Sequence, residues 1–357
     1  DKCPPWTIQS RKMLHDNKKK TIYYDHAIVK VYDIPIFYFP KFSHPDPTVD
    51  RRSGFLPPTL YDSKNLGSGI SLPYFVNLGN DKNFTLTNRI YNTENPLILG
   101  EYHQAFRNSN FLADFGYTEG YKKTSSTKKS GDKSHFFAKI IKNFEGKNGS
   151  DNTFSLTTQE VSNDKYLKLY KIQSNLVAYN QDTLENSLNF AHSDEDKFFG
   201  FNVSIYETLK ENYEDKYEYV LPEITFAKNL LSDQNLGNID YQSNYKAHAY
   251  ETNKFTNFLV NDFDWTSKNL SSNQGFKTTI LGNLKNINYE AKNEKIYKDE
   301  FTSELFGALG LLSSLKLEKK NNNLNHFLAP KILIRYSPGS MRKETSGIKL
   351  DPLSAFG

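Results

Sequence analysis

Residue types that carry chemistry are present in this sequence, but they are scattered. The acidic run Asp194-Glu195-Asp196 lacks the alternating ligands and the glycine of a calcium loop. Gly67-Ser68-Gly69 lacks the strand–glycine–helix context of a phosphate cradle. Asp50 and Ser53 lie outside any nucleophile elbow. No two histidines have the spacing of metal ligands; they are His15, His26, His44, His103, His135, His192, His248 and His326. We therefore predict no catalytic site, no metal site and no cofactor.

Basic side chains are the other candidates for chemistry. Arginine binds phosphate through parallel hydrogen bonds, so Arg51 and Arg52 are candidates for contact with a phosphate group. A structural role for the same pair, at the start of the next hairpin, stays open. Lys18–Lys20 and the lysines within 122–129 are typical of solvated loops. Lys plus Arg is 45 and Asp plus Glu is 41, a balance that gives no support for nucleic-acid binding.

Cys3 is the only cysteine of the chain. A single cysteine excludes an internal disulfide framework and a zinc site built on cysteines. Neither of the two methionines is residue 1, and no signal peptide is recognisable. We interpret the chain as a fragment, so this observation does not bear on the compartment.

The composition favours strands. Phe, Tyr and Trp make up 14% of the residues, which is too much for a disordered chain. Abundant Phe and Tyr with a hydrophobic fraction of only 37% suits many half-buried strands. The mean hydropathy is −0.68, and no run approaches the roughly 18 apolar residues of a membrane helix. Helical membrane proteins are excluded, whereas membrane β-barrels are not, because their strands alternate.

A period of two recurs along the sequence. Large apolar residues at 199, 201, 203 and 205 alternate with small or polar ones, which places them on one face of a strand. Short Asn, Asp, Gly and Ser segments between such stretches predict hairpins. Further strands are expected at 28–39, 70–78, 97–106, 110–118, 135–142, 165–172, 175–180, 217–226, 238–249, 256–265, 276–289 and 330–336. Most have the length that crosses a bilayer when tilted, about 8–11 residues.

Three segments are ambiguous or polar. Residues 301–316 fit a helix of period 3.6 and equally a strand followed by a turn, so both readings stay open. Segments 122–134 and 318–326 are rich in Lys, Ser and Asn and are predicted to be loops.

The segment from residue 22 to residue 106 contains an ordered series of motifs. The first three are Pro35-Ile36-Phe37-Tyr38-Phe39-Pro40, His44-Pro45-Asp46-Pro47 and Arg51-Arg52-Ser53-Gly54-Phe55-Leu56-Pro57. Three more follow at 72–75, 81–87 and 99–102. In this order and spacing the chain resembles the LptD family, the lipopolysaccharide-assembly proteins of the Gram-negative outer membrane. His103 stands where the family has Arg, and beyond residue 110 the likeness is mostly one of pattern.

The resemblance implies an all-β fold in two parts. Residues 1–33 would be the last strands of a periplasmic β-jelly roll. Residues 34–357 would be the first half of an antiparallel, up-and-down transmembrane β-barrel, incomplete here, of about 26 strands. The family implies transport of lipopolysaccharide from a periplasmic groove to a seam in the barrel wall. It also implies an LptE-like plug lipoprotein and an LptA-like periplasmic bridge as partners, with the outer membrane as the location.

Two sets of residues follow from this resemblance. Proline lacks the donor of a ladder hydrogen bond, worth about 1 kcal/mol, so prolines near the seam would let it open; the candidates are Pro35, Pro40, Pro45 and Pro47. The same prolines could instead only shape a domain junction. Candidates for the lipid groove are Ile22, Tyr23, Tyr24, Ile28, Val29 and Val31. Alternation groups Tyr23 mostly with Ala27, Val29 and Val31, and Ile22 with Tyr24 and Ile28. Either face could line the groove, and ordinary core packing is the alternative.

In an oxidising periplasm, Cys3 would either pair with a cysteine beyond the fragment or remain a lone thiol. Two other classes of protein stay open. One is a generic outer-membrane barrel, such as a porin or receptor. The other is a soluble β-rich protein that binds carbohydrate or nucleic acid.

Overall fold

The structure is a computed structural model. It describes residues 6–338 apart from 32, 50, 126–127, 129, 212, 252, 272–274 and 322–323. The described residues are mostly β-strand, with the short helix α1 (Tyr166–Tyr170) and the 3-10 turn η1 (Lys147–Gly149). The chain divides into two compact units, Asp1–Phe106 with Leu112–Ser134, and Arg107–Phe111 with His135–Gly357.

The first unit contains a four-stranded antiparallel sheet. Its strands are β1 (Trp6–Gln9), β2 (Lys12–Asp16), β3 (Thr21–Val31) and β4 (Ile34–Pro45). β4 pairs with β3 over its whole length. β1 and β2 pair in succession with the two halves of β3, so they share the edge of β3 that faces away from β4.

The first unit also contains an antiparallel run of five strands. They are β5 (Gly54–Phe55), β6 (Thr59–Ser63), β7 (Gly67–Asn77), β8 (Lys82–Tyr91) and β9 (Leu97–Ala105). The short strands β5 and β6 both pair with β7. β7 pairs with β8, and β8 pairs with β9.

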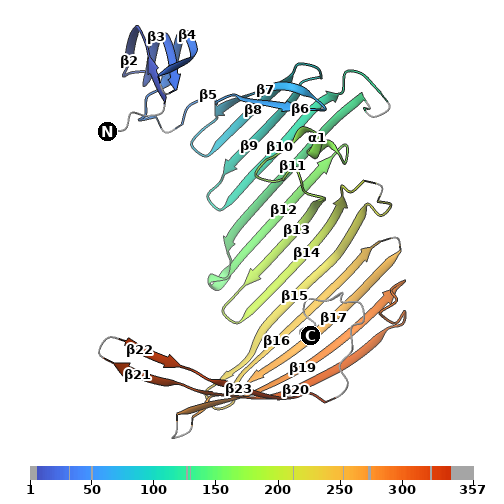
Figure 1. Cartoon of the computed structure of the whole chain (residues 1–357). Helices are drawn as coiled ribbons and strands as arrows, with labels where there is room; N and C mark the ends of the chain where they lie inside the picture. Colours follow the sequence, from blue (N-terminus) through green and yellow to red (C-terminus); the bar gives the residue numbers. More distant parts are fainter. Residues whose placement is uncertain are drawn as a thin grey trace. The chain divides into compact units, whose positions relative to one another are not determined.

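β10 (Ser109–Gly120) and β11 (Ser130–Glu145) each have residues in both units. The strands of the second unit alternate in direction. They lie side by side in chain order, except that the last strand, Lys331–Tyr336, pairs with Thr302–Leu315, and the hairpin between these two lies outside the main sheet (Figure 1). They are β12 (Asp151–Val161), β13 (Thr183–Ser193), β14 (Lys197–Thr208), β15 (Tyr217–Asp233), β16 (Gly237–Tyr250), β17 (Lys254–Thr266), β18 (Leu270–Ser271), β19 (Phe276–Lys292), β20 (Thr302–Leu315), β21 (Leu317–Asn321), β22 (Leu324–Leu328) and β23 (Lys331–Tyr336). The all-β, antiparallel, up-and-down fold expected from the sequence is confirmed.

The register explains the alternation seen in β14. Phe201 lies between Phe190 of β13 and Ile224 of β15, whereas Asn202 lies between Asn189 and Glu223. Cross-strand partners share a face of the sheet. One face is therefore apolar and the other polar at this level, as the period of two predicts.

The structure decides the reading left open at 301–316 and corrects other expectations about single elements. The segment 301–316 is the strand β20, paired with β19 along its length, and the helical reading is excluded. Apolar residues occur on both faces of this strand, which hides its period of two. The segment 318–326, expected to be a loop, belongs to the hairpin β21–β22. β11 begins at Ser130, so the end of segment 122–134 is also strand.

Three other expected strands differ in the structure. Residues 28–39 form the end of β3 and the start of β4, with a turn at Asp33, whose φ is 65°. The segments expected as strands at 165–172 and 175–180 form α1 and irregular backbone. There Tyr166, Leu167 and Tyr170 are buried and form a local core. Within the described residues, no helix has the length and apolar character needed to span a bilayer.

The predicted domain boundary at residue 33 falls in the turn between β3 and β4. β4 belongs to the same four-stranded sheet as β3. The division into a jelly-roll end and barrel strands stays a prediction.

Candidate functional site

One face of the four-stranded sheet carries a row of aromatic rings. On β4, the ring centroids of Phe37 and Phe39 lie 6.3 Å apart, and those of Phe39 and Phe42 lie 5.6 Å apart. His44 continues the row, 6.2 Å from Phe42. Tyr24 of β3 lies 5.8 Å from Phe42 and 5.4 Å from His44. We call this side of the sheet the aromatic face.

The residues that β3 contributes to the aromatic face are identified by their partners on β4, because cross-strand partners share a face. They are Val29 opposite Phe37, Ala27 opposite Phe39, Tyr24 opposite Phe42 and Ile22 opposite His44. The other edge of β3 adds Ile8 beside Val29 and Met13 beside Tyr24. Phe37 is 61% exposed and Phe39 is 38% exposed, so the row is accessible to an apolar ligand.

An irregularity in the middle of β3 and β4 creates this continuous face. Tyr24 and Ala27 are three residues apart, and strict alternation would place them on opposite faces. His26 between them has a φ of 53°, a left-handed conformation that is uncommon for a residue with a side chain. Pro40 stands opposite His26, where the register skips one pair. At this point the alternation of side chains between the two faces shifts by one residue in both strands.

The grouping of groove candidates by alternation is therefore correct on each side of His26 and wrong across it. Ile22 and Tyr24 share the aromatic face with Val29, and Val31 follows on that face two residues later. Tyr23 and Ile28 lie on the opposite face, beside Ser43 and Tyr38. The structure thus brings together four of the six candidates. The aromatic residues of β4, which the sequence analysis did not select, complete the face; their alternation at 37 and 39 was the available signal.

The opposite face of the sheet carries charged and polar groups beside Tyr23, Ile28 and Tyr38. Arg11 donates a hydrogen bond of 2.9 Å to Asp25, and this contact holds the pKa of the Asp25 carboxyl below its usual value. His26 stacks on Tyr38 with centroids 5.8 Å apart and contacts its hydroxyl group. The two faces of one small sheet therefore differ in chemistry: one carries the row of aromatic rings, and the other carries an ion pair among polar and apolar side chains.

His44 fixes the position of Tyr24 at the end of the aromatic face. Its Nδ1 lies 2.6 Å from the carbonyl oxygen of Pro45, and its Nε2 lies 2.8 Å from the Tyr24 hydroxyl. A carbonyl oxygen only accepts hydrogen bonds, so Nδ1 donates, and in the neutral imidazole Nε2 accepts from the hydroxyl of Tyr24. Beside it, His15 contacts Asp46. The pKa of Asp46 is lowered mainly by hydrogen bonds from Thr48.

The predicted gate prolines lie in and next to the four-stranded sheet. Pro35 pairs with Lys30 at a register shift, and Pro40 stands opposite His26. Pro45 ends β4 opposite Thr21, and Pro47 lies in the turn that follows. These are irregular positions of a ladder, where proline is tolerated.

The longer antiparallel run has its own proline-bearing interruption. β5 and β6 are separated by Leu56, Pro57 and Pro58. The pairing with β7 shifts by one residue across this break, and the amide of Leu56 donates to the Pro73 carbonyl at 2.9 Å. Pro73 lies within β7. These prolines are not among the gate residues predicted from the sequence, although Pro57 closes the motif that begins at Arg51.

Arg51 and Arg52 both contact the chain itself. Arg52 donates to the carbonyl of Lys19 at 3.4 Å and contacts the Thr21 hydroxyl. Arg51 donates to the carbonyl of Asn80 at 3.1 Å, and its guanidinium lies 5.8 Å from the centre of the Phe75 ring. These contacts support the structural role.

Ser53 extends the same set of contacts, because its hydroxyl accepts a 2.8 Å hydrogen bond from the Asn77 amide. The arginine motif therefore links the β2–β3 turn to β7 and to the β7–β8 turn. Contact with a lipid phosphate stays a prediction. Cys3 lies outside the described residues.

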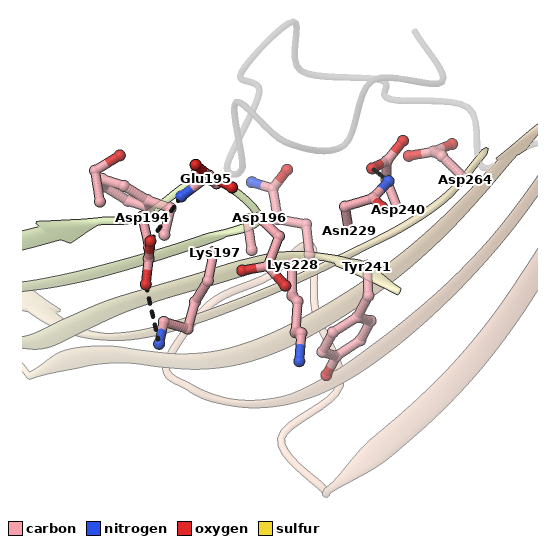
Figure 2. Close-up of a pocket in the computed structure, with 13 residues that line it drawn as sticks. Asp194, Glu195, Asp196, Lys197, Lys228, Asn229, Asp240, Tyr241 and Asp264 are labelled. Carbon is pink, nitrogen blue, oxygen red and sulfur yellow. Dashed lines mark hydrogen bonds and ion pairs between the residues drawn. The ribbon is translucent and has the colours of Figure 1, made fainter. Parts of the chain in front are cut away.

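A pocket of about 320 Å³ in the second unit contains the acidic run noted in the sequence (Figure 2). Asp194, Glu195 and Asp196 line it together with carboxylates from the neighbouring strands. Lys197 lies 3.9 Å from Asp194, and Asn229 donates to Asp240 at 2.8 Å. In the part of the chain that the structure describes, no three His, Cys, Asp or Glu residues are placed to hold a metal ion. We therefore keep the aromatic face as the candidate site.

The fold and the site together define a class of protein, an all-β chain in which a small sheet with an aromatic face precedes a long antiparallel run of strands. No family model matches the chain. Three of the proteins to which it is similar are each named LPS-assembly protein LptD. The one from Psychrobacter cryohalolentis is 32% identical over 112 residues, 30% of this chain and 11% of the relative. The one from Francisella tularensis subsp. holarctica is 31% identical over 129 residues, which are 34% of this chain and 14% of the relative.

The third relative, from Methylococcus capsulatus, is 34% identical over 116 residues, 29% of this chain and 11% of the relative. These matches confirm the resemblance to the LptD family that the motifs indicate. They cover about a third of this chain and a much smaller share of each relative.

Proposed function

We propose that this chain is part of an outer-membrane translocon that assembles lipopolysaccharide. In this proposal the four-stranded sheet is the end of a periplasmic jelly roll and receives the lipid. The antiparallel strands are barrel strands, and the lipid leaves sideways through a seam between strands into the outer leaflet. The observation that carries the proposal is the aromatic face, which is open, continuous and formed by the segment with the LptD-like motifs.

The physical argument starts from the acyl chains of the lipid. Each methylene removed from water contributes about 0.8 kcal/mol. The row from Phe37 to Tyr24 offers an accessible apolar surface on one face only. A lipid on this face therefore stays away from the Arg11–Asp25 ion pair on the other. The relatives are named for LPS assembly, which supports lipopolysaccharide as the amphiphile.

Location, domains and partners belong to the same proposal. Alternating apolar and polar faces, as at Phe201 and Asn202, suit strands that cross the outer membrane. The pairing of β4 with β3 supports a junction between jelly roll and barrel near Pro45 rather than at residue 33. An LptE-like plug and an LptA-like periplasmic bridge are the proposed partners, and the proposed role is transport rather than enzymatic catalysis.

A matched pair of tyrosines tests the proposal. Tyr23 and Tyr24 are neighbours on β3 but lie on opposite faces. We expect a photoreactive phenylalanine analogue at Tyr24 to crosslink lipopolysaccharide in growing cells, because this side chain lies on the aromatic face. The same analogue at Tyr23 should crosslink at least about tenfold less, a difference that corresponds to roughly 1.4 kcal/mol of contact. Immunoblots for lipopolysaccharide on the purified protein give the yield.

The controls separate folding from binding. Both variants must support growth, which shows that the protein is assembled. Position Ile28 serves as a second control on the opposite face and Phe37 as a second test on the aromatic face. Equal labelling on both faces, or none on either, would contradict the proposed lipid path.

The gate proposal rests on missing ladder donors. We expect the double variant Pro35→Val and Pro40→Val to slow the arrival of lipopolysaccharide at the cell surface several-fold, because each restored donor contributes about 1 kcal/mol to strand pairing. A second double variant, Pro58→Val and Pro73→Val, tests the interruption between β5 and β6. Surface lipopolysaccharide is followed by pulse labelling.

The comparison of the two double variants locates the gate. Pro96, in the turn between β8 and β9, is the control position, where Pro96→Ala should leave export unchanged. If only the second double variant slowed lipopolysaccharide export, the gate would lie at the β5–β6 interruption. Unchanged export in both would remove the proline gate from the proposal.

A further inference from the structure

The hairpin β21–β22 continues the pair β20–β23 without a change of register. Leu309 pairs with Tyr336, and Leu317 pairs with Leu328. The two residue numbers add to the same sum in both pairs, so the two ladders form one long hairpin. The amide of Leu315 donates to the Pro330 carbonyl at 3.1 Å in the same register. The ladder is interrupted only near Lys316 and Pro330, and β21–β22 extends beyond the sheet (Figure 1).

One face of this long hairpin is apolar along most of its length. Because the register is constant, residues that alternate along β20 and β21 share a face with their partners on β22 and β23. The exposed apolar members of this face are Leu305, Leu309, Leu311, Leu317, Leu324, Leu328, Ile332, Ile334 and Tyr336. Within β21–β22 the cross-strand pair Lys319 and His326 lies on the same face, between the leucines. Leu324 and Leu328 lie outside the main sheet and are 65% and 62% exposed.

The hairpin is longer than a membrane crossing requires. β20 and β21 together run from Thr302 to Asn321, about twice the 9–11 residues of a tilted transmembrane strand. If β20 and β23 cross the membrane, β21–β22 must lie beyond the hydrocarbon core. An isolated two-stranded hairpin is at best marginally stable in water. Contact of its apolar face with another apolar surface would therefore stabilise β21–β22.

The charge of the hairpin selects the kind of surface. Lys316, Lys319, Lys320 and Lys331 lie in or next to it, against Glu318 as the only acidic residue of segment 316–331. Lys316 lies 6.0 Å from the centre of the Phe327 ring. Apolar side chains flanked by lysines suit the boundary between acyl chains and anionic head groups, where lysines extend to the phosphates.

We infer that the hairpin β21–β22 is an arm that lies on the surface of the membrane and binds its anionic head groups. The face with Leu317, Leu324 and Leu328 enters the boundary region. Lys319, on the same face, and Lys320, on the opposite face and 3.6 Å from Glu318, extend to lipid phosphates. The break at Lys316 and Pro330 lets the arm turn from the crossing strands into the membrane plane. This inference rests on the proposed membrane location of β20 and β23.

Depth-dependent fluorescence quenching tests the arm. The whole protein, with Cys3→Ser, is reconstituted into vesicles of phosphatidylethanolamine and phosphatidylglycerol, and an environment-sensitive dye is attached to Leu328→Cys. We expect quenching by lipids that carry a nitroxide near the head group. The variant Lys319→Gln with Lys320→Gln should shift the bound fraction of the arm toward the free state by about fivefold for each lysine. Vesicles of phosphatidylcholine alone should give the same loss.

Two further labels keep the outcomes distinct. Leu309→Cys, on the crossing part of the same face, should be quenched by nitroxides deep in the acyl chains. Asn235→Cys, in the polar turn between β15 and β16, should not be quenched. Quenching at Leu309 without quenching at Leu328 overturns the arm and leaves the proposed membrane location intact. Absence of quenching at Leu309 overturns that location and the arm with it. Quenching at Leu328 that is indifferent to the lysines and to lipid charge overturns the head-group contact.

Discussion

Replacing Gly237 by valine is expected to lower the free energy of unfolding by at least about 3 kcal/mol. Gly237 begins β16 with a φ of 91°, a region that side chains with a Cβ rarely adopt. A Cβ at this position would lie 2.1 Å from the Thr266 carbonyl oxygen and 2.7 Å from two backbone atoms of Ser267. These neighbours are backbone, so the clash can be relieved only by breaking the pairing of β16 with β17.

The measurement uses a fluorophore close to the site. The Trp265 indole donates a 2.9 Å hydrogen bond to the carbonyl of Leu236, so its emission reports on this turn. Urea titration of the protein folded in detergent micelles gives the free energy. Gly307→Ala is the matched control, because a Cβ there meets no atom closer than 3.9 Å and the backbone φ is ordinary. Equal losses in both variants would show that the conformation of Gly237 is unimportant.

Replacing Lys285 by methionine is expected to cost about 3–5 kcal/mol, the second large effect. The Lys285 side chain is only 4% exposed, and its Nζ lies 3.4 Å from the carboxylate of Asp262, which is 13% exposed. Removing the ammonium group leaves a carboxylate in a site with little water, and Asp264 lines the same pocket. The desolvated charge, rather than the lost contact itself, carries the cost.

Two variants check this reasoning. Adding Asp262→Leu to Lys285→Met removes the unpaired charge and should restore most of the lost stability. Lys168 and Asp182 form a shorter ion pair, 2.6 Å, whose side chains are about half exposed. Lys168→Met should therefore cost less than about 1 kcal/mol, because water screens that pair. If the exposed pair proved more important than the buried one, or if Asp262→Leu failed to rescue, the argument from desolvation would be wrong.

The sequence determined the fold class because a strand with one apolar face shows a local alternation of apolar and polar residues. The alternation at Phe199, Phe201 and Val203 needs no knowledge of the neighbours, and the register later placed Phe201 between two apolar partners. The motif from Arg51 to Pro57 likewise indicated the LptD-like family through order and spacing, and the similar proteins confirmed it. Strands with apolar residues on both faces, such as β20, show no such alternation and could not be identified in this way.

The composition of the site was decided by tertiary structure. Whether Tyr24 shares a face with Ala27 depends on the left-handed backbone at His26 and on Pro40 opposite it, and neither residue alone predicts a phase change in both strands. The contacts of Arg52 with Lys19 and Thr21 join residues about thirty positions apart, beyond any local pattern. Sequence by itself indicated most of the strands, because alternation depends on neighbouring residues, but not segments such as 166–170 and 317–328, whose structure departs from the local pattern. Only folding decided which side chains meet, because faces and partners depend on register.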